Sequence, residues 1–293
     1  MRYRVVDVFT TEELEGNPLA VFPDATGLDQ LKMQKIAREL NLSETTFVLP
    51  STRSDCVARV RIFTPRQEMA FAGHPIIGTS FVLLDEKLIT AHDGGFALDL
   101  AAGSVPVRVE ICDRPLIWLK TPPITWGRTF ESAVCAETLS LDPEDLLDIP
   151  PQQLSAGNPT IFIAVKDKSA VDRVVLDMAG LRKLKGEQND AMFVFVFTPT
   201  VQGAYSRMFA PDFGVPEDPA TGSATGPLAA YMMRHRLVAM GTGTRFFSEQ
   251  GTAIGRRSIL YVQINGEGGA NGIEVGGYVT PVIEATMTLR QIC

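Results

Sequence analysis

Short apolar runs dominate the pattern of hydrophobic and polar positions along this chain. The runs are rich in β-branched and aromatic residues, end at turn residues and are shorter than most helices, which is typical of strands. Eight of them predict strands, at 4–9, 47–49, 56–63, 105–111, 161–165, 192–197, 205–209 and 259–264. The chain is therefore expected to be mainly sheet.

Apolar residues recur at helical spacing in only a few places. The segment 29–40 has this spacing, and Asn41 can end the helix in the left-handed conformation. Two further helices are expected to start at Pro75 and Pro219, because proline has no N–H group and suits the first turn of a helix. A short helix is expected after Asp142-Pro143. The pattern thus predicts an α+β protein with few helices.

Four short motifs occur twice along the chain, in the same order. The pairs are Gly16-Asn17-Pro18 with 157–159, 44–48 with 190–194, Arg61-Ile62-Phe63-Thr64-Pro65 with 207–211, and 73–78 with 217–222. Their offsets stay between 141 and 146 residues. An ordered repeat of this kind predicts two similar halves, each made of strands and one main helix.

Two similar halves are expected to pack about a pseudo-twofold axis, with a small-molecule site in the cleft between them. The helix starts at Pro75 and Pro219 would then point into one cleft. Their unpaired N–H groups, with a partial charge of about +0.5, favour a carboxylate or a developing enolate. His74 and Asp218 would occupy mirror positions there. Ordinary capping of the two helices by these side chains is the alternative interpretation, and it is compatible with a function.

Each candidate side chain also has a simpler interpretation. Local sequence alone favours a solvated loop position for Glu44, whereas a buried Glu44 would have a raised pKa suited to taking and returning a proton. His74 is either a buried capping imidazole or a hydrogen-bond donor and proton relay. Asp218 follows Glu217, and two acids at a helix start are electrostatically favourable without any catalysis.

Composition and charge exclude several classes of protein. The chain has 293 residues and a net charge of −7, without a basic run, so nucleic acid and anionic membranes are not expected partners. No apolar stretch reaches the length of a membrane span, and the N-terminus has no signal-peptide core, which predicts a cytoplasmic location.

Metal and cofactor motifs are missing from the sequence. The four cysteines, Cys56, Cys112, Cys135 and Cys293, are scattered, so neither a zinc site nor a disulfide framework is expected. The histidines do not pair at ligand spacing, and no HExxH motif, phosphate loop or complete dinucleotide motif is present. We therefore expect no metal and no cofactor. No cysteine lies in or beside the motifs, so a thiol-pair racemase mechanism is unsupported.

The motifs together resemble the PhzF-like family, named for the isomerase of phenazine biosynthesis, which is related to diaminopimelate epimerase. The matching stretches run through nearly the whole chain: Asp7-Val8-Phe9, 16–21, Leu42-Ser43-Glu44-Thr45-Thr46-Phe47, 61–65, 71–75, Arg207 with 209–211, 217–224, Ser248-Glu249-Gln250-Gly251 and Gly255-Arg256. One departure is Ile76-Ile77, where the family frequently has a threonine, and this bears on the identity of the substrate.

The resemblance implies an α+β fold of two pseudo-symmetric domains, each a mixed β-sheet or barrel around a central helix, as in diaminopimelate epimerase. The halves would be 1–118 and 119–280, with 281–293 packing back on the first half and the active site between them. It also implies a homodimer and isomerisation without cofactor or metal.

The resemblance further assigns a role to individual residues. Glu44 matches the proton-transferring glutamate of the family, and His74 and Asp218 match residues that contact the substrate. Gly73, Gly222 and Ser223 fall in the loops that hold it. The function expected is an isomerase that moves a proton on a small cyclic or aromatic-like carboxylic acid. The alternatives are an amino-acid or hydroxy-acid epimerase or racemase, and a non-catalytic binding protein on the same fold.

Overall fold

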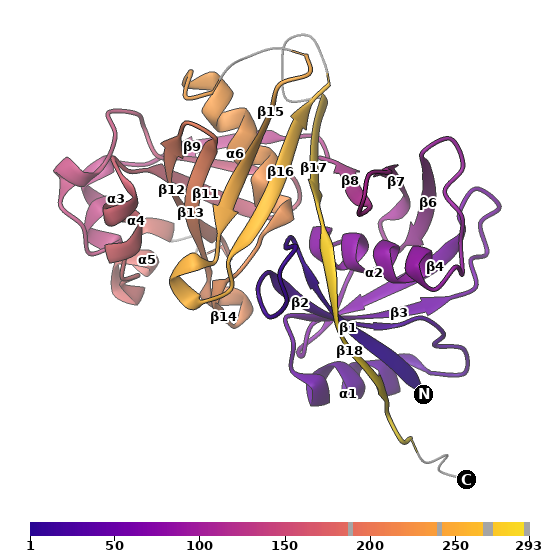
Figure 1. Ribbon diagram of the computed structural model, residues 1–293. Helices are drawn as coiled ribbons and strands as arrows, with labels where there is room; N and C mark the ends of the chain where they lie inside the picture. The colour runs from indigo at the N-terminus through magenta and orange to yellow at the C-terminus, as the bar shows by residue number, and fades with distance from the viewer. Residues whose placement is uncertain (187–189, 239–241, 266–271, 290–293) are drawn as a thin grey trace. The chain divides into compact units, whose positions relative to one another are not determined.

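The computed structural model describes residues 1–186, 190–238, 242–265 and 272–289. The described chain is a mixed α+β structure, mostly sheet with few helices (Figure 1). It divides into two compact units, Met1–Lys120 with Gly276–Cys293, and Thr121–Val275.

The first unit has antiparallel sheet interrupted by two parallel pairs. Strand β1 pairs antiparallel with β2 and with β18, β2 pairs parallel with β3, and β3 pairs antiparallel with β4. β4 then pairs antiparallel with β5 and parallel with β6. β6 pairs antiparallel with β7, and β7 pairs antiparallel with β8. The elements are β1 (Arg2–Val8), β2 (Asn17–Phe22), α1 (Gln30–Leu40), β3 (Glu44–Leu49), β4 (Ala58–Phe63), β5 (Glu68–Met69), α2 (Gly73–Asp85), β6 (Gly95–Leu100), β7 (Gly103–Glu110), β8 (Leu116–Lys120) and β18 (Val279–Thr286).

The second unit has the same order of pairings. β10 pairs antiparallel with β11, β11 parallel with β12, β12 antiparallel with β13, β13 antiparallel with β14 and parallel with β15, and β15 antiparallel with β16. The elements are β9 (Thr125–Thr129), α3 (Ser132–Thr138), η1 (Pro143–Asp145), β10 (Gln152–Ser155), β11 (Pro159–Ala164), α4 (Lys168–Arg173), α5 (Met178–Lys185), β12 (Phe193–Thr200), β13 (Gly203–Ala210), η2 (Pro211–Phe213), β14 (Val215–Asp218), α6 (Gly222–Arg234), β15 (Arg245–Gln250), η3 (Thr252–Ile254) and β16 (Ser258–Ile264), before β17 (Ile273–Gly277).

One helix in each unit is buried on all sides. In α2 every residue from His74 to Leu83 is buried, and the helix contacts β1, β2, β3, β8 and β18 (Figure 1). In α6 every residue from Ala224 to Met233 is buried, and the helix contacts β10, β11 and β16. A helix that is buried all round belongs to the core, so the first turn of each of these helices is held by the surrounding sheet.

The predicted helix over 29–40 is confirmed as α1. Its N-cap Asp29 accepts a hydrogen bond from the backbone N–H of Lys32, at 2.7 Å. Asn41 ends it with φ of 51°, and its N–H donates to the carbonyl of Ala37. Both caps are local, which is why the sequence pattern defines this helix well. The short helix expected after Asp142-Pro143 is the 3₁₀ turn η1.

The predicted starts of the two buried helices are wrong. Helix α2 begins at Gly73, two residues before Pro75, and α6 begins at Gly222, three residues after Pro219. His74 is therefore the second residue of its helix, whereas Asp218 ends strand β14. The N-cap of α6 is Thr221, whose carbonyl accepts the first helical hydrogen bonds, from Ala224 and Thr225. The expected mirror positions of His74 and Asp218 are thus corrected, and neither side chain is the N-cap of its helix, as the alternative interpretation had it.

A repeated arginine–glutamate pair shows the true register of the repeat. Arg61 of β4 donates through Nε and Nη2 to the two oxygens of Glu68, at 2.7 and 2.6 Å. Arg207 of β13 does the same to Glu217, at 2.9 and 2.7 Å. The partners are 7 residues apart in the first unit and 10 in the second, and the turn η2 lies between them in the second. Ser223, not Asp218, is therefore the counterpart of His74.

We predict that Arg207→Met destabilises the protein far more than Arg53→Met does. Arg207 and Glu217 are only 12% and 10% exposed, so losing the arginine leaves a largely buried carboxylate without its bidentate partner. Such a loss costs about 3 kcal/mol. Arg53 forms an exposed pair with Asp55, which contributes at most about 1 kcal/mol. Urea unfolding of both variants measures the difference, and equal losses would contradict the prediction.

Candidate active site

A mostly buried carboxylate and a buried imidazole meet in the first unit. Glu44 is the first residue of β3, and His74 is the second residue of α2. Oε2 of Glu44 lies 3.2 Å from Nε2 of His74, and the two side chains are 15% and 7% exposed. The solvated loop position that local sequence favours for Glu44 is therefore wrong. The sheet carries this residue into the protein because β3 pairs with β2 and β4 on its two sides.

A second contact holds the same strand against the same helix. Thr46, two residues beyond Glu44 on β3, shares a hydrogen bond of 2.8 Å between hydroxyl groups with Thr79 of α2. Both threonines are fully buried. Because buried hydroxyl groups are costly to leave unbonded, this pair fixes how β3 and α2 lie beside each other. The Glu44–His74 contact is thus part of a rigid packing arrangement.

The other ring nitrogen of His74 has a partner that the sequence did not reveal. Nδ2 of Asn17 lies 3.5 Å from Nδ1 of His74, and Asn17 is fully buried. Asn17 starts β2, directly after Gly16, which has φ of 69°. A Cβ on Gly16 would come within 2.5 Å of the carbonyl oxygen of Val8, so only glycine fits this turn. The repeated Gly-Asn-Pro motif was the available signal for this contact.

His74 is neutral near neutral pH. Burial of the imidazole lowers its pKa from 6.5 to about 3, since the charged form would lose its hydration. A neutral imidazole carries one N–H group and one lone pair. His74 can therefore donate a hydrogen bond to a carboxylate without placing a full positive charge beside it.

Asp218 lies in a separate polar network in the second unit. Its Oδ2 accepts a hydrogen bond of 2.5 Å from the hydroxyl of Thr221, and its backbone oxygen accepts one of 2.7 Å from Nε2 of Gln250. Gln250 also donates to the Thr221 hydroxyl, at 3.1 Å, and its Oε1 accepts from the Thr221 N–H, at 3.3 Å. The network fixes the orientation of the Asp218 carboxylate just before helix α6.

Sequence reasoning missed Thr221 and Gln250, although both lie in motifs of the PhzF-like family. Gln250 is followed by Gly251, which has φ of 78°. A Cβ there would lie 2.3 Å from the carbonyl oxygen of Arg256 and 2.6 Å from that of Pro219. The glycine therefore allows the strand that carries Gln250 to approach the segment that carries Asp218.

The remaining candidates lie at the starts of the two buried helices. Gly73 is the first residue of α2, and Gly222 and Ser223 are the first two residues of α6. All three are half-buried. The first N–H groups of a helix have no partner within it, so they can bind an anion or a developing oxyanion. The first unit thus contains Glu44, Gly73 and His74, and the second Asp218, Gly222 and Ser223.

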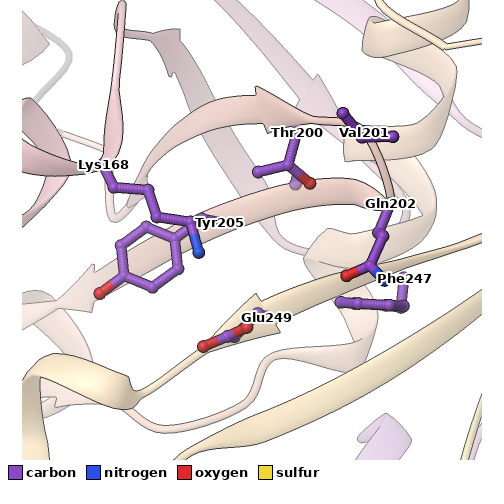
Figure 2. Close-up of a pocket in the computed structure, with 8 residues that line it drawn as sticks. Lys168, Thr200, Val201, Gln202, Tyr205, Phe247 and Glu249 are labelled. Carbon is purple, nitrogen blue, oxygen red and sulfur yellow. The ribbon is translucent and has the colours of Figure 1, made fainter.

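A hollow of about 300 Å³ lies elsewhere in the second unit (Figure 2). Its charged and aromatic side chains contact one another or other protein groups. The Tyr205 hydroxyl donates to Asp172, at 2.6 Å, the Lys168 ammonium lies 4.7 Å from the Tyr205 ring centre, and Arg257 donates to Glu249, at 3.2 Å. None of the six candidate residues lines this hollow. We therefore place the candidate chemistry at the helix starts instead.

The described residues offer no metal cluster or reactive thiol pair. Within them, no group of three or more His, Cys, Asp or Glu side chains is arranged to hold a metal ion. Cys56, Cys112 and Cys135 carry free thiols, and none of them lies on α2 or α6. Burial raises the pKa of Cys135 to about 12. Cys293 lies outside the described residues. Across the described ranges, no helix is long and apolar enough to cross a membrane.

Comparison with known proteins gives a consistent result. The model of the phenazine biosynthesis-like protein family, PhzC-PhzF, matches residues 6–285. The chain is 37% identical to the trans-2,3-dihydro-3-hydroxyanthranilate isomerase of Pseudomonas aeruginosa, over 94% of this chain and 95% of that one.

Two solved structures resemble the chain over 99% of both lengths. One is a phenazine biosynthesis protein of the PhzF family from Bacillus anthracis, with a TM-score of 0.87 and 24% identity. The other is a predicted epimerase from Pseudomonas aeruginosa, with a TM-score of 0.81 and 33% identity. The match thus covers both units, and the chain belongs to the phenazine biosynthesis-like, or PhzF, family and is an isomerase.

Proposed function

We propose that this isomerase moves a proton between two carbons of a small cyclic carboxylic acid, with Glu44 as the group that carries the proton. The observation that carries this proposal is the buried contact between Glu44 and His74, 3.2 Å between Oε2 and Nε2. The relative from Pseudomonas aeruginosa is named for trans-2,3-dihydro-3-hydroxyanthranilate. That compound is therefore the first substrate to test, as a representative of cyclic hydroxy acids.

The proposed reaction begins with the Glu44 carboxylate removing a proton from a carbon that is adjacent or vinylogous to the substrate carboxylate. The electron pair left behind delocalises into the conjugated system. Glu44, now protonated, returns its proton to a different carbon of that system and becomes a carboxylate again. No oxidant or reductant is needed, because one C–H bond breaks, another forms and the double bonds shift.

The surroundings of Glu44 suit both halves of this reaction. Nε2 of a neutral His74 lies 3.2 Å from the carboxylate, close enough to donate a hydrogen bond to it after a small adjustment. A neutral ring also lacks the strong pull of an imidazolium, which would make Glu44 a weak base. The N-terminus of α2, with Gly73 as its first residue, carries partial positive charge that stabilises negative charge developing on the substrate. One such donor contributes about 10²–10³-fold to a rate.

We assign substrate binding to Asp218, Gly222 and Ser223 of the second unit. The Asp218 carboxylate, oriented by Thr221, is suited to accept a hydrogen bond from a substrate amino or hydroxyl group. The N–H groups at the start of α6 and the Ser223 hydroxyl are suited to bind a carboxylate or carbonyl oxygen. Together these groups match the two ends of an amino- or hydroxy-substituted acid.

We predict that Glu44→Gln severely lowers turnover of trans-2,3-dihydro-3-hydroxyanthranilate and leaves its binding intact. The amide keeps the shape of the side chain but cannot take up the proton, so kcat is expected to fall by about 10²–10⁴-fold. The measurement is product formation together with NMR in D₂O, which shows deuterium entering at the new carbon. Glu39→Gln, at an exposed position on α1, is the matched control and should keep full activity.

The same NMR experiment separates the alternatives. Turnover or deuterium uptake that persists in Glu44→Gln would remove Glu44 from the mechanism. Deuterium at the original carbon with inversion of configuration would instead indicate an epimerase. Binding of cyclic acids by the wild-type protein with neither product formation nor exchange at any carbon would indicate a binding protein on this fold.

We predict that the buried, neutral state of His74 makes the protein less stable as the pH falls from about 6 to about 3. In this window the unfolded chain, with a histidine pKa near 6.5, binds a proton that the folded protein, with a pKa of about 3, does not bind. The unfolding free energy should lose up to about 1.4 kcal/mol per pH unit from this group. Urea unfolding between pH 7 and pH 4 measures it.

The control for this experiment is a second histidine substitution. His74→Asn should show a flatter dependence of stability on pH than the wild type. The substitution removes the group whose pKa differs between the folded and the unfolded chain. His92→Asn removes an exposed histidine of the same unit and should keep the wild-type dependence. If His74→Asn and the wild type respond to pH in parallel, the neutral state of His74 is contradicted.

A further inference from the structure

The side chain of Asn17 lies where it can select one of the two neutral forms of His74. Its Nδ2 atom is 3.5 Å from Nδ1 of the imidazole, and the opposite ring nitrogen, Nε2, is 3.2 Å from the Glu44 carboxylate. Asn17 is fully buried, and His74 is 6% exposed. With so little access to solvent, the two protein groups on either side of the ring decide where its proton resides.

With the Asn17 amide in this orientation and Glu44 ionised, the chemistry of the three groups favours one arrangement. The nitrogen of an amide only donates hydrogen bonds, so it requires a lone pair on Nδ1. An ionised carboxylate only accepts them, so it requires an N–H group at Nε2. The opposite tautomer would place the Nδ1 proton against the amide hydrogens and the Nε2 lone pair against the carboxylate oxygen. Both contacts of that tautomer are repulsive.

We infer that Asn17 is a positioning residue that holds the proton of His74 on Nε2, facing Glu44. This inference rests on the proposed function of Glu44 as the proton carrier. When Glu44 is a carboxylate, an N–H group at Nε2, 3.2 Å away, is placed to donate to it and to stabilise it as a base. Without Asn17 the ring could turn over or change tautomer, and Glu44 would then face a lone pair of the imidazole instead of an N–H group.

The repeat supplies a matched position for comparison. Asn158 occupies the same place in the second Gly-Asn-Pro motif, before strand β11, but it is half-buried. The second residue of α6 is Ser223, so the helix of that unit presents no imidazole at the corresponding position. Asn158→Asp therefore makes the same chemical change at the same motif, without an imidazole at the corresponding position of its helix.

The test is the protonation of the His74 ring, read by two-dimensional ¹H–¹⁵N NMR of full-length protein labelled at histidine. Spectra of His92→Asn and His235→Asn assign the His74 signals by elimination. In the wild type at pH 7 we expect a protonated Nε2 and a bare Nδ1. A proton on Nδ1 with a bare Nε2, or an imidazolium, would overturn the inference. The wild-type spectrum alone can show this, without any variant of Asn17.

Two variants then test whether Asn17 causes this preference. Asn17→Asp places an acceptor beside Nδ1, so the proton is expected to move to Nδ1. Asn17→Leu removes the donor without adding an acceptor, so a mixture of the two tautomers is expected. Asn158→Asp should leave the His74 signals unchanged. If both Asn17 variants keep the wild-type tautomer, Asn17 does not set it.

The kinetic readout separates this inference from the proposed function. Asn17→Asp is expected to lower kcat for trans-2,3-dihydro-3-hydroxyanthranilate by about 10²-fold, the lower range for a positioned acid or base, with little change in substrate binding. Asn158→Asp should retain wild-type kcat. If the wild type has no isomerase activity but the Asn17 variants show the expected tautomer shift, the proposed function fails and the structural role of Asn17 stands. A tautomer shift without any loss of kcat would overturn its role in positioning.

Discussion

The close approach of a carboxylate to an imidazole inside the first unit constrains much of the surrounding structure. Burying two polar groups is unfavourable unless each has a partner at the right distance. Glu44 comes from a strand and His74 from a helix, and the two residues are 30 positions apart in the sequence. The paired strands on both sides of β3, the Thr46–Thr79 hydrogen bond and the turn at Gly16 all serve to keep these elements in register.

The chemistry proposed for the site depends on the absence of net charge on the imidazole. A protonated histidine beside Glu44 would hold the carboxylate in its ionised form and weaken it as a base. Burial prevents this, because the charged ring cannot be hydrated there, and it also makes the side chain dependent on its neighbours for the location of its single proton. The same exclusion of water therefore sets both the charge of His74 and the importance of Asn17.

Features fixed by neighbouring residues were predictable from the sequence, whereas features fixed across the fold were not. Helix α1 is defined by Asp29 and Asn41, both at its own ends. The start of α6 instead depends on Thr221, which Gln250 contacts from a strand 29 residues further along. Proline at 219 was therefore a misleading marker. Local sequence favoured a solvent-exposed Glu44, and only the pairing of strands shows that most of this side chain is covered. The contact of Asn17 with His74 spans 57 residues and follows from no local rule.

The two arginine–glutamate pairs have a consequence for how such a chain can change over evolutionary time. The turn η2 adds residues between Arg207 and Glu217, yet Glu217 returns to the same bidentate contact that Glu68 makes in the other unit. The arginine–glutamate pair thus tolerates a difference in loop length before the glutamate. The helix that follows therefore starts from the same point on the sheet in both units. Insertions and deletions in this loop can therefore accumulate while the helix start keeps its place on the sheet, so the loop can vary in length without any change to the scaffold.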